Sequence, residues 1–160
     1  MKTPLEILAQ LEQIRAATLA RLEDLTQDRL DQRPSVEGEE EAWSLGEVFM
    51  HIALDEHYLR EQIARPLLEG VQPPESILFL PPPPPYGAKK ETILFWFERA
   101  RLMTRRLLEN VPPEANLDLK HAGGLELMNG LEWLEGYGAH EAFHHQQIDA
   151  LLSSTIDDRR

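Results

Sequence analysis

Two histidines near the C-terminal end of the chain, His140 and His144, are the residues whose type and spacing point most directly to chemistry. Residues four apart lie one turn apart on the same face of a helix, so both imidazoles can reach one divalent metal ion. The chain contains no cysteine, and any transition-metal site must therefore use nitrogen and oxygen ligands. Because residues 140–144 also match the H-E-x-x-H pattern of zinc proteases, the spacing alone leaves the kind of site open.

The histidine pair shares its helix face with apolar side chains. At about 100° per residue, one sector of about 80° on this helix contains Trp133, Tyr137, His140, His144, Gln147 and Leu151. We expect this sector to enter the core, where an unpaired polar group costs about 1–3 kcal/mol. Both imidazoles therefore need a hydrogen-bond partner or a bound ligand. His145 lies about 100° away and is expected at the boundary between core and solvent.

A third histidine, His51, lies at the edge of the apolar stripe of an earlier helix. Glu47 and Asp55 lie one turn before and after it, and either carboxylate could accept the distal N–H of a metal-bound imidazole. His57 faces another direction and is interpreted as a surface residue, whereas His121 could approach a site but has no informative spacing. A third histidine on a second inward face favours a metal site, since bundle cores commonly assemble metals from facing helices.

The elements that must position these residues are amphipathic helices, which apolar residues at helical intervals predict over residues 4–28, 44–66, 89–110 and 129–153. The second helix begins with a capping box formed by Ser44 and Glu47. Residues 112–128 are predicted to be irregular, with a small hairpin as an option around Gly123 and Gly124. Four helices of this length in one domain predict an all-α fold, namely a four-helix bundle with at least one long crossover.

The segment between the second and third helices, residues 66–86, contains most of the prolines, including a run at positions 81–85. Such a run cannot be helical and favours the extended polyproline II conformation. Twenty residues at about 3.1 Å each exceed the length of about 33 Å of a 22-residue helix, so the segment can cross from one end of a bundle to the other. We interpret it as a rigid connector; a ligand for an SH3-type partner is the alternative.

Length and charge restrict the classes of partner. The 160 residues predict one domain, residues 1–160, and the formal net charge of −12 disfavours both nucleic acid and an anionic membrane surface as partners. No apolar run approaches the roughly 20 residues of a membrane span. The first residues lack the apolar core of a signal peptide, and the absence of cysteine fits a reducing compartment, so we expect a cytoplasmic protein.

Two blocks of the sequence resemble the DinB-like (DinB/YfiT) superfamily. The first block, residues 43–53, reads WSLGEVFMHIA and is similar to the family's W-S-x-x-E-x-x-x-H entry to the second helix. The second block, residues 131–148, reads LEWLEGYGAHEAFHHQQI and is similar to the closing helix, H-x-x-x-H-x-x-Q-I. The two blocks occur in the family's order, and the resemblance spans nearly the whole chain.

The resemblance implies a fold, a site and a class of reaction. Members fold as four-helix bundles in up-down-down-up order with a long connection between helices two and three, which residues 66–86 suit. The family's metal triad maps onto His51, His140 and His144. Family activities centre on thiol chemistry, including transfer of low-molecular-weight thiols such as bacillithiol and mycothiol-dependent isomerisation. The implied partners are therefore a small-molecule thiol or electrophile, and a homodimer is expected because dimers are common in the family.

A mechanism follows from the charge of such a site together with the resemblance. Three neutral imidazoles leave a divalent metal at +2, a strong Lewis acid that would lower the pKa of a bound thiol or water. Histidine ligands suit zinc, nickel, iron and copper alike, so the identity of the metal stays open. We expect Gln147, Trp133, Tyr137 and Trp43 around the site, with plain core packing as the alternative role of the three aromatic residues.

Three other interpretations account for part of the pattern. A zinc protease needs a third ligand after its H-E-x-x-H helix, but the residues after His144 include no Glu and no His beyond His145. In that interpretation Glu141 would be the general base, whereas in a bundle it is expected to be peripheral. A di-iron carboxylate bundle needs two Glu-x-x-His motifs, and only one is present. A metal-free helical binding or dimerisation module, with its histidines bonded to carboxylates, remains the main alternative.

Overall fold

The computed structural model describes residues 2–34 and 42–154, and within them the chain is all-α, as predicted. The helices are α1 (Pro4–Leu22), α2 (Gln27–Asp31), α3 (Leu45–Leu59), the π-helical turn η1 (Arg60–Ala64), α4 (Arg65–Leu68), α5 (Lys90–Glu109) and α6 (Gly130–Ser154). No β-strand occurs in these residues, and none of their helices is long and apolar enough to cross a membrane.

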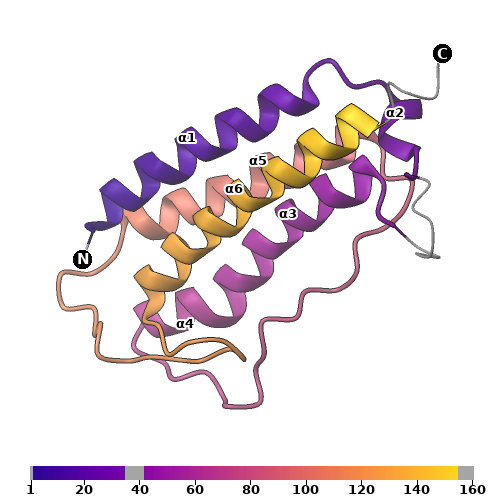
Figure 1. The fold of residues 1–160 in the computed structure, drawn as a ribbon. Coiled ribbons are helices and arrows are strands. Elements are labelled where there is room, and N and C mark those ends of the chain that lie inside the picture. The colour runs from indigo at the N-terminus through magenta and orange to yellow at the C-terminus, as the bar shows by residue number, and fades with distance from the viewer. Residues whose placement is uncertain (1, 35–41, 155–160) are drawn as a thin grey trace.

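The four long helices lie side by side and run along a common direction (Figure 1). In that view α1 and α6 run from left to right, whereas α3 and α5 run from right to left. Helix α6 packs against both α1 and α3, and α3 packs in addition against α5. The candidate histidines on α3 and α6 therefore belong to neighbouring helices.

The first helix ends earlier than predicted. Instead of one helix over residues 4–28, α1 ends at Leu22, and the short helix α2 follows. The physical reason is a second helix start at Thr26, whose side chain accepts a hydrogen bond from the backbone N–H of Arg29. Threonine favours this position because its hydroxyl satisfies a backbone donor that a helix start leaves without a partner. Leu30 on α2 is completely buried.

The second helix, predicted to end near Pro66, continues through η1 and α4 to Leu68. In a regular α-helix the proline ring would meet the carbonyl four residues earlier. The π-helical turn immediately before α4 changes the hydrogen-bond register at this point, and Pro66 then occupies the first turn of α4. The helix therefore accommodates the proline instead of ending there.

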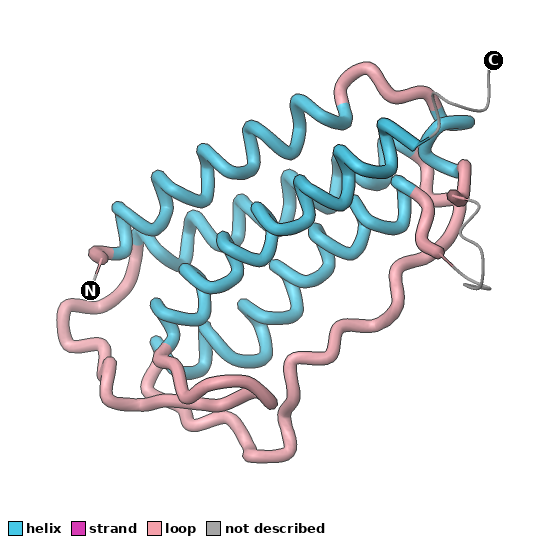
Figure 2. The backbone as a smooth tube through the Cα atoms, viewed as in Figure 1, coloured by secondary structure: helices cyan, strands magenta, loops and turns pink. Residues whose placement is uncertain are grey.

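Two long loops, residues 69–89 and 110–129, meet beside the end of α4 (Figure 2). Three hydrogen bonds tie them together: Phe79 N–H to the Gly123 carbonyl at 2.8 Å, Gln72 Nε2 to the Lys120 carbonyl at 3.0 Å, and His121 Nε2 to the Ile77 carbonyl at 2.7 Å. The optional hairpin around Gly123 and Gly124 does not form as a pair of strands, and a single isolated bridge between His121 and Met128 is present instead.

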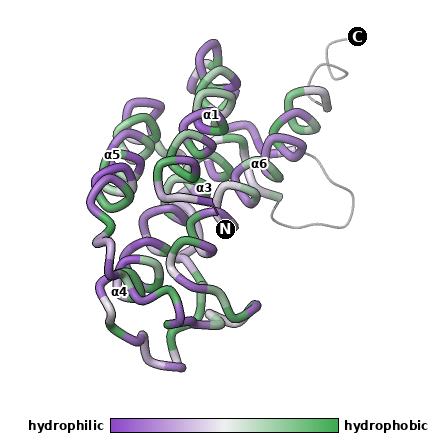
Figure 3. The backbone as a smooth tube through the Cα atoms, turned by 90° about the vertical axis from the view of Figure 1, so that its left-hand side faces the viewer, coloured by the Kyte–Doolittle hydropathy of each residue, from purple (hydrophilic) through white to green (hydrophobic). Residues whose placement is uncertain are grey.

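Each long helix carries hydrophilic and hydrophobic residues in alternation along its length, as Figure 3 shows. The buried apolar side chains form two clusters. One contains Trp133 and Tyr137 of α6 together with Leu11 of α1. The other contains Phe49 of α3 and Phe97 of α5, whose rings meet edge to face at 6.3 Å. The first cluster also contains Leu59 of α3, and the second also contains Ile148 of α6, so both clusters join the two histidine-bearing helices.

Candidate metal centre

Three imidazoles meet between α3 and α6. His51 comes from α3, and His140 and His144 come from α6. One ring nitrogen from each histidine lies within 4.8 Å of those of the other two. The ring centroids are 4.5 Å apart for His140 and His144, 4.8 Å for His51 and His144, and 5.5 Å for His51 and His140. The described residues contain no other group of this kind.

The start of α3 is fixed by the predicted capping box. The Ser44 side chain accepts from the Glu47 N–H at 3.2 Å, and the Glu47 carboxylate accepts from the Ser44 N–H at 2.8 Å. The other carboxylate oxygen of Glu47 accepts from Arg33 Nη2 at 2.8 Å. Glu47 therefore holds the end of the helix that carries His51, and its oxygens are engaged by groups other than the imidazole that we expected it to orient.

Gln147 sets the proton position on His144. Its amide oxygen lies 2.7 Å from His144 Nδ1, and an amide oxygen can only accept, so Nδ1 carries the proton. The lone pair of His144 is then on Nε2, which lies 3.1 Å from His140 Nε2 at the centre of the cluster. An outer hydrogen bond of this kind is what orients a metal-binding imidazole.

Asp55 contacts the histidines on the inner side of the cluster. Its Oδ2 lies 2.9 Å from His140 Nε2 and 3.1 Å from His51 Nε2. We expected a carboxylate behind the imidazole, on its distal nitrogen. The structure instead places Asp55 against His140 Nε2, the same atom that meets His144. Asp55 is 1% exposed, so this carboxylate is buried together with the rings.

The electrostatics of the cluster keep two of its histidines neutral. Burial, followed by the neighbouring His144 and His140, lowers the pKa of His51 to about 3. Burial is also the main cause that lowers the pKa of His144. Burial raises the pKa of Asp55, and the contact with His140 opposes this shift. Neutral imidazoles have free lone pairs at pH 7, and a metal needs deprotonated ligands.

Aromatic side chains surround the cluster. The Trp43 ring lies 4.9 Å from the His51 ring, as expected of a wall residue. Phe79, from the proline-rich segment, lies 6.5 Å from the ring of His140, whose side chain is 36% exposed. The cluster is therefore accessible at His140. Sequence reasoning missed Phe79, because an irregular segment offers no periodicity that would indicate where its side chains point.

Two of the expected wall residues are core residues. The Tyr137 hydroxyl lies 3.0 Å from both the Ile52 carbonyl and the Glu141 carboxylate. The Trp133 indole donates to the His121 carbonyl at 2.9 Å. Both rings are at most 2% exposed, so their role here is the packing role that the sequence left open.

The remaining histidines have other partners. His57 Nδ1 accepts from Arg60 Nη2 at 3.1 Å, on a different face of the helix from His51. His121 holds the two long loops together through Ile77, as described above, and is buried. His145 is half-buried, and its Nε2 lies 2.8 Å from the Thr18 hydroxyl, which agrees with the expected boundary position. None of the three belongs to the described histidine cluster.

Glu141 lies in a buried network of charges, and the expectation that it is peripheral was wrong. Its carboxylate accepts from Arg15 Nε at 2.7 Å, from Arg101 Nη2 at 3.2 Å and from the Thr18 hydroxyl at 2.6 Å. Glu56 of α3 completes the network, with both arginines as partners. Burial alone would raise the pKa of Glu56, but the two arginines lower it to about 2. A glutamate paired in this way is not available as the general base of a zinc protease.

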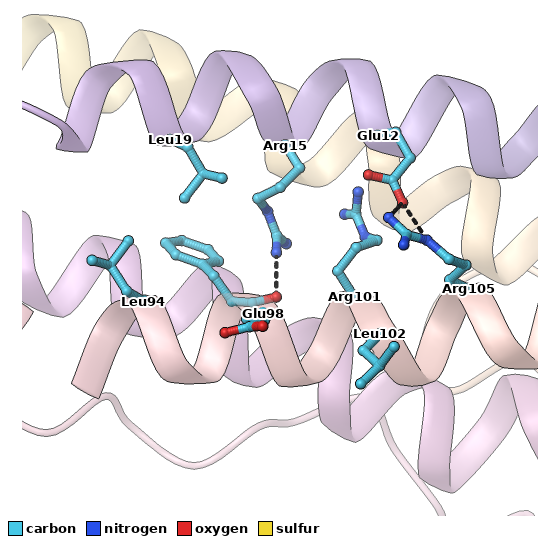
Figure 4. Close-up of a pocket in the computed structure, with 9 residues that line it drawn as sticks. Glu12, Arg15, Leu19, Leu94, Glu98, Arg101, Leu102 and Arg105 are labelled. Carbon is cyan, nitrogen blue, oxygen red and sulfur yellow. Dashed lines mark hydrogen bonds and ion pairs between the residues drawn. The ribbon is translucent and has the colours of Figure 1, made fainter. Parts of the chain in front are cut away.

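The arginines of this network also line a groove of about 430 Å³ between α1 and α5 (Figure 4). Arg15 and Arg101 extend from the two facing helices, and Arg15 Nη1 donates to the Phe97 carbonyl at 3.0 Å. Arg105 pairs with Glu12 across the groove at 2.7 Å. The histidines do not line this groove, which is therefore separate from the candidate metal centre.

Fold and site together define an all-α protein with a cluster of three histidines that fits a divalent metal ion. The family model of the DinB superfamily matches residues 10–148, which is most of the chain, and the protein therefore belongs to the DinB superfamily. Searches among curated proteins and among solved structures gave no match.

Proposed function

We propose that this protein binds one divalent metal ion, namely zinc, nickel or iron, through His51, His140 and His144. Its proposed activity is that of a metal-dependent transferase of low-molecular-weight thiols, or of a related hydrolase or isomerase. The observation that carries the proposal is the convergence of three imidazoles from two neighbouring helices within 4.8 Å. Family membership supports it, because the match includes all three histidines.

In the proposed reaction, the residues around the metal would have separate roles. The bound metal would supply Lewis acidity towards a thiol or water. Gln147 holds the proton of His144 on Nδ1 and so keeps Nε2 available as a ligand. Trp43 and Phe79 lie beside the rings of His51 and His140 and would exclude water from one side of a bound substrate. The exposed edge of His140 is the side from which a small thiol or electrophile would enter.

The proposal extends to the architecture and the setting of the protein. We propose that α1, α3, α5 and α6 form the up-down-down-up four-helix bundle of the family, with residues 69–89 as its proline-rich crossover. The directions of the helices in Figure 1 and the packing of α6 against α1 and α3 support this arrangement. A cytoplasmic homodimer with a small-molecule thiol or electrophile as its partner completes the proposal.

A metal-free helical module is the second candidate, and one observation favours it. The histidines have polar partners without an ion: Asp55 Oδ2 accepts from His140 Nε2 and lies 3.1 Å from His51 Nε2, and Gln147 accepts from His144. Such a network would be stable as a structural element. The two candidates differ in whether removal of metal changes the stability of the protein.

The reaction is tested by screening the metal-loaded protein with glutathione, bacillithiol and mycothiol against halogenated and epoxide acceptors. We expect thiol-dependent consumption of an acceptor that stops after chelation and returns when the metal is restored. The His144→Ala variant should be inactive. Turnover that survives both chelation and His144→Ala would contradict a role for this site, and the absence of turnover with every thiol would reject the transferase proposal.

A further inference from the structure

We propose that Asp55 is a fourth protein ligand of the metal, through Oδ2, so that the site is formed by three histidines and one aspartate. This inference rests on the proposed metal-binding function. Family resemblance indicates only the histidines, whereas the contacts of Asp55 come from the structure. Asp55 follows His51 by one turn of α3, and its Oδ2 contacts His51 Nε2 and His140 Nε2 together.

The spacing of these atoms matches that of ligands around one ion. Nitrogen and oxygen ligands bind zinc at about 2.0–2.2 Å, and two ligands on one ion at tetrahedral or right angles are therefore separated by about 2.8–3.6 Å. Asp55 Oδ2 lies 2.9 Å from His140 Nε2 and 3.1 Å from His51 Nε2. His140 Nε2 lies 3.1 Å from His144 Nε2. These three separations fall in the range of neighbouring ligands. The set of ligand atoms that all lie within 4.8 Å of one another contains the three histidines without Asp55, so binding by all four residues requires a small movement of the Asp55 or His144 side chain.

A carboxylate that only orients the imidazoles, without binding the metal, would make a different contact. An outer-sphere aspartate contacts the distal ring nitrogen and leaves the metal-facing nitrogen free. Gln147 has that position with respect to His144, because it contacts Nδ1 while Nε2 faces the cluster. Asp55 contacts His140 at Nε2, the nitrogen that faces His144. Gln147 therefore contacts the outer nitrogen of His144, whereas Asp55 contacts the nitrogen of His140 that faces the cluster.

The burial of Asp55 also indicates a cation. The residue is 1% exposed, and its second oxygen, Oδ1, has no hydrogen-bond partner among the described residues. A buried carboxylate without full hydrogen bonding is unfavourable unless a positive charge compensates it. The arginines near the helix pair are engaged with Glu56 and Glu141 instead. A metal ion beside Oδ2 would supply the missing charge.

A fourth ligand of this kind changes what the site can hold. Three imidazoles and one carboxylate lower the net charge of a divalent site from +2 to +1. Nitrogen and carboxylate ligands favour divalent zinc, iron, nickel or manganese over monovalent copper, which prefers sulfur. The positions left for a substrate are then those towards the exposed edge of His140.

The full chain loaded with zinc provides the direct test by crystallography. We expect an Asp55 carboxylate oxygen at about 2.0–2.2 Å from the metal. A metal held by the three histidines, with both Asp55 oxygens beyond about 3 Å, would overturn this inference and leave the proposed function in place. Failure of the wild-type chain to bind any metal would overturn both.

A solution measurement separates a ligand from a positioning residue. Cobalt(II) is titrated into the wild type, Asp55→Asn and Asp55→Glu. Asp149→Asn is the control for the same substitution on α6, because Asp149 pairs with Arg21 at the surface, and it should bind cobalt like the wild type. We expect Asp55→Asn to weaken binding at least tenfold and to change the visible spectrum of bound cobalt, with partial recovery in Asp55→Glu. Weaker binding with an unchanged spectrum would show a positioning role and overturn the inference. If Asp55→Asn fails to fold, the crystal structure decides.

Discussion

At the scale of single residues, the hydrogen bond from His144 to Gln147 leads to a first prediction, which concerns the affinity for metal. Gln147→Ala removes the acceptor that holds the proton on Nδ1, so His144 can turn or change tautomer. Loss of such an outer contact typically weakens metal binding about 10- to 100-fold. Competition against a chromogenic chelator measures this change. The exposed neighbour Gln146 provides the matched control, since Gln146→Ala should bind metal like the wild type; equal affinity in both variants would contradict the assigned role.

A second prediction concerns the buried charges around Glu141. Glu141→Gln removes the negative partner of two buried arginines, and breaking a buried ion pair on one side typically costs about 3–5 kcal/mol. Urea unfolding measures this loss. Glu135→Gln is the control, because Glu135 pairs with Lys2 at the surface and such pairs contribute about 0–1 kcal/mol. A loss below 1 kcal/mol in Glu141→Gln would show that the network is not the stabilising element we describe.

Residue spacing predicted the histidines of the site, but it could not predict the contacts of Asp55. Helical periodicity placed His140 and His144 on one face, and the structure brings both to His51. The contact of Asp55 with Nε2 depends on how the rings are turned, which spacing does not encode. The buried network did leave a signal: Arg15 lies one turn after Leu11 on an apolar stripe, and a charged residue there implies a buried partner.

At the scale of elements, α6 approaches η1 and α4 closely, and this packing leads to a third prediction, which concerns the stability of the protein. A Cβ at Gly130 would lie 2.6 Å from Leu68 Cγ and 2.7 Å from the Ala64 carbonyl, so Gly130→Ala forces these elements apart. Overpacking of this kind costs about 1–3 kcal/mol.

The control for this prediction lies on the same helix. Among the described residues outside its own helix, the atom nearest to a Cβ at Gly136 would be Met128 Sδ at 3.9 Å. Alanine is also the better helix former by up to about 1 kcal/mol. Gly136→Ala should therefore leave the protein as stable as the wild type or make it more stable. Thermal unfolding of both variants checks the pair. Similar melting temperatures for Gly130→Ala and Gly136→Ala would contradict the close packing at the start of α6.

The helices themselves were largely predictable from the sequence, and the errors in their predicted ends have local causes. The long helices α5 and α6 begin and end within one residue of the predicted positions, because their apolar periodicity is continuous. The break after Leu22 was missed because the apolar periodicity continues to Leu25, which concealed the new start at Thr26. The continuation beyond Pro66 was missed because proline ordinarily ends a helix, and a π-helical turn is not visible in the residue pattern.

For the whole molecule, metal binding should change the stability of the fold, because the site joins α3 to α6. A ligand that binds only the folded chain stabilises it by about 2.7 kcal/mol at a free concentration of 100 times its dissociation constant. For a domain of this size, removal of the metal by a chelator should lower the melting temperature by about 5–10 °C. An unchanged melting temperature would favour the metal-free helical module. Restoring the metal controls for a direct effect of the chelator.

The most direct test of the central proposal is the metal content of the chain after loading with zinc and removal of the excess. We expect about one ion per chain in the wild type, and little or none in His51→Ala and His144→Ala. His57→Ala serves as the control, because His57 lies on the same helix as His51 but pairs with Arg60, and this variant should keep its metal. Equal, near-stoichiometric zinc in the wild type and in His144→Ala would contradict a site shared by the three histidines.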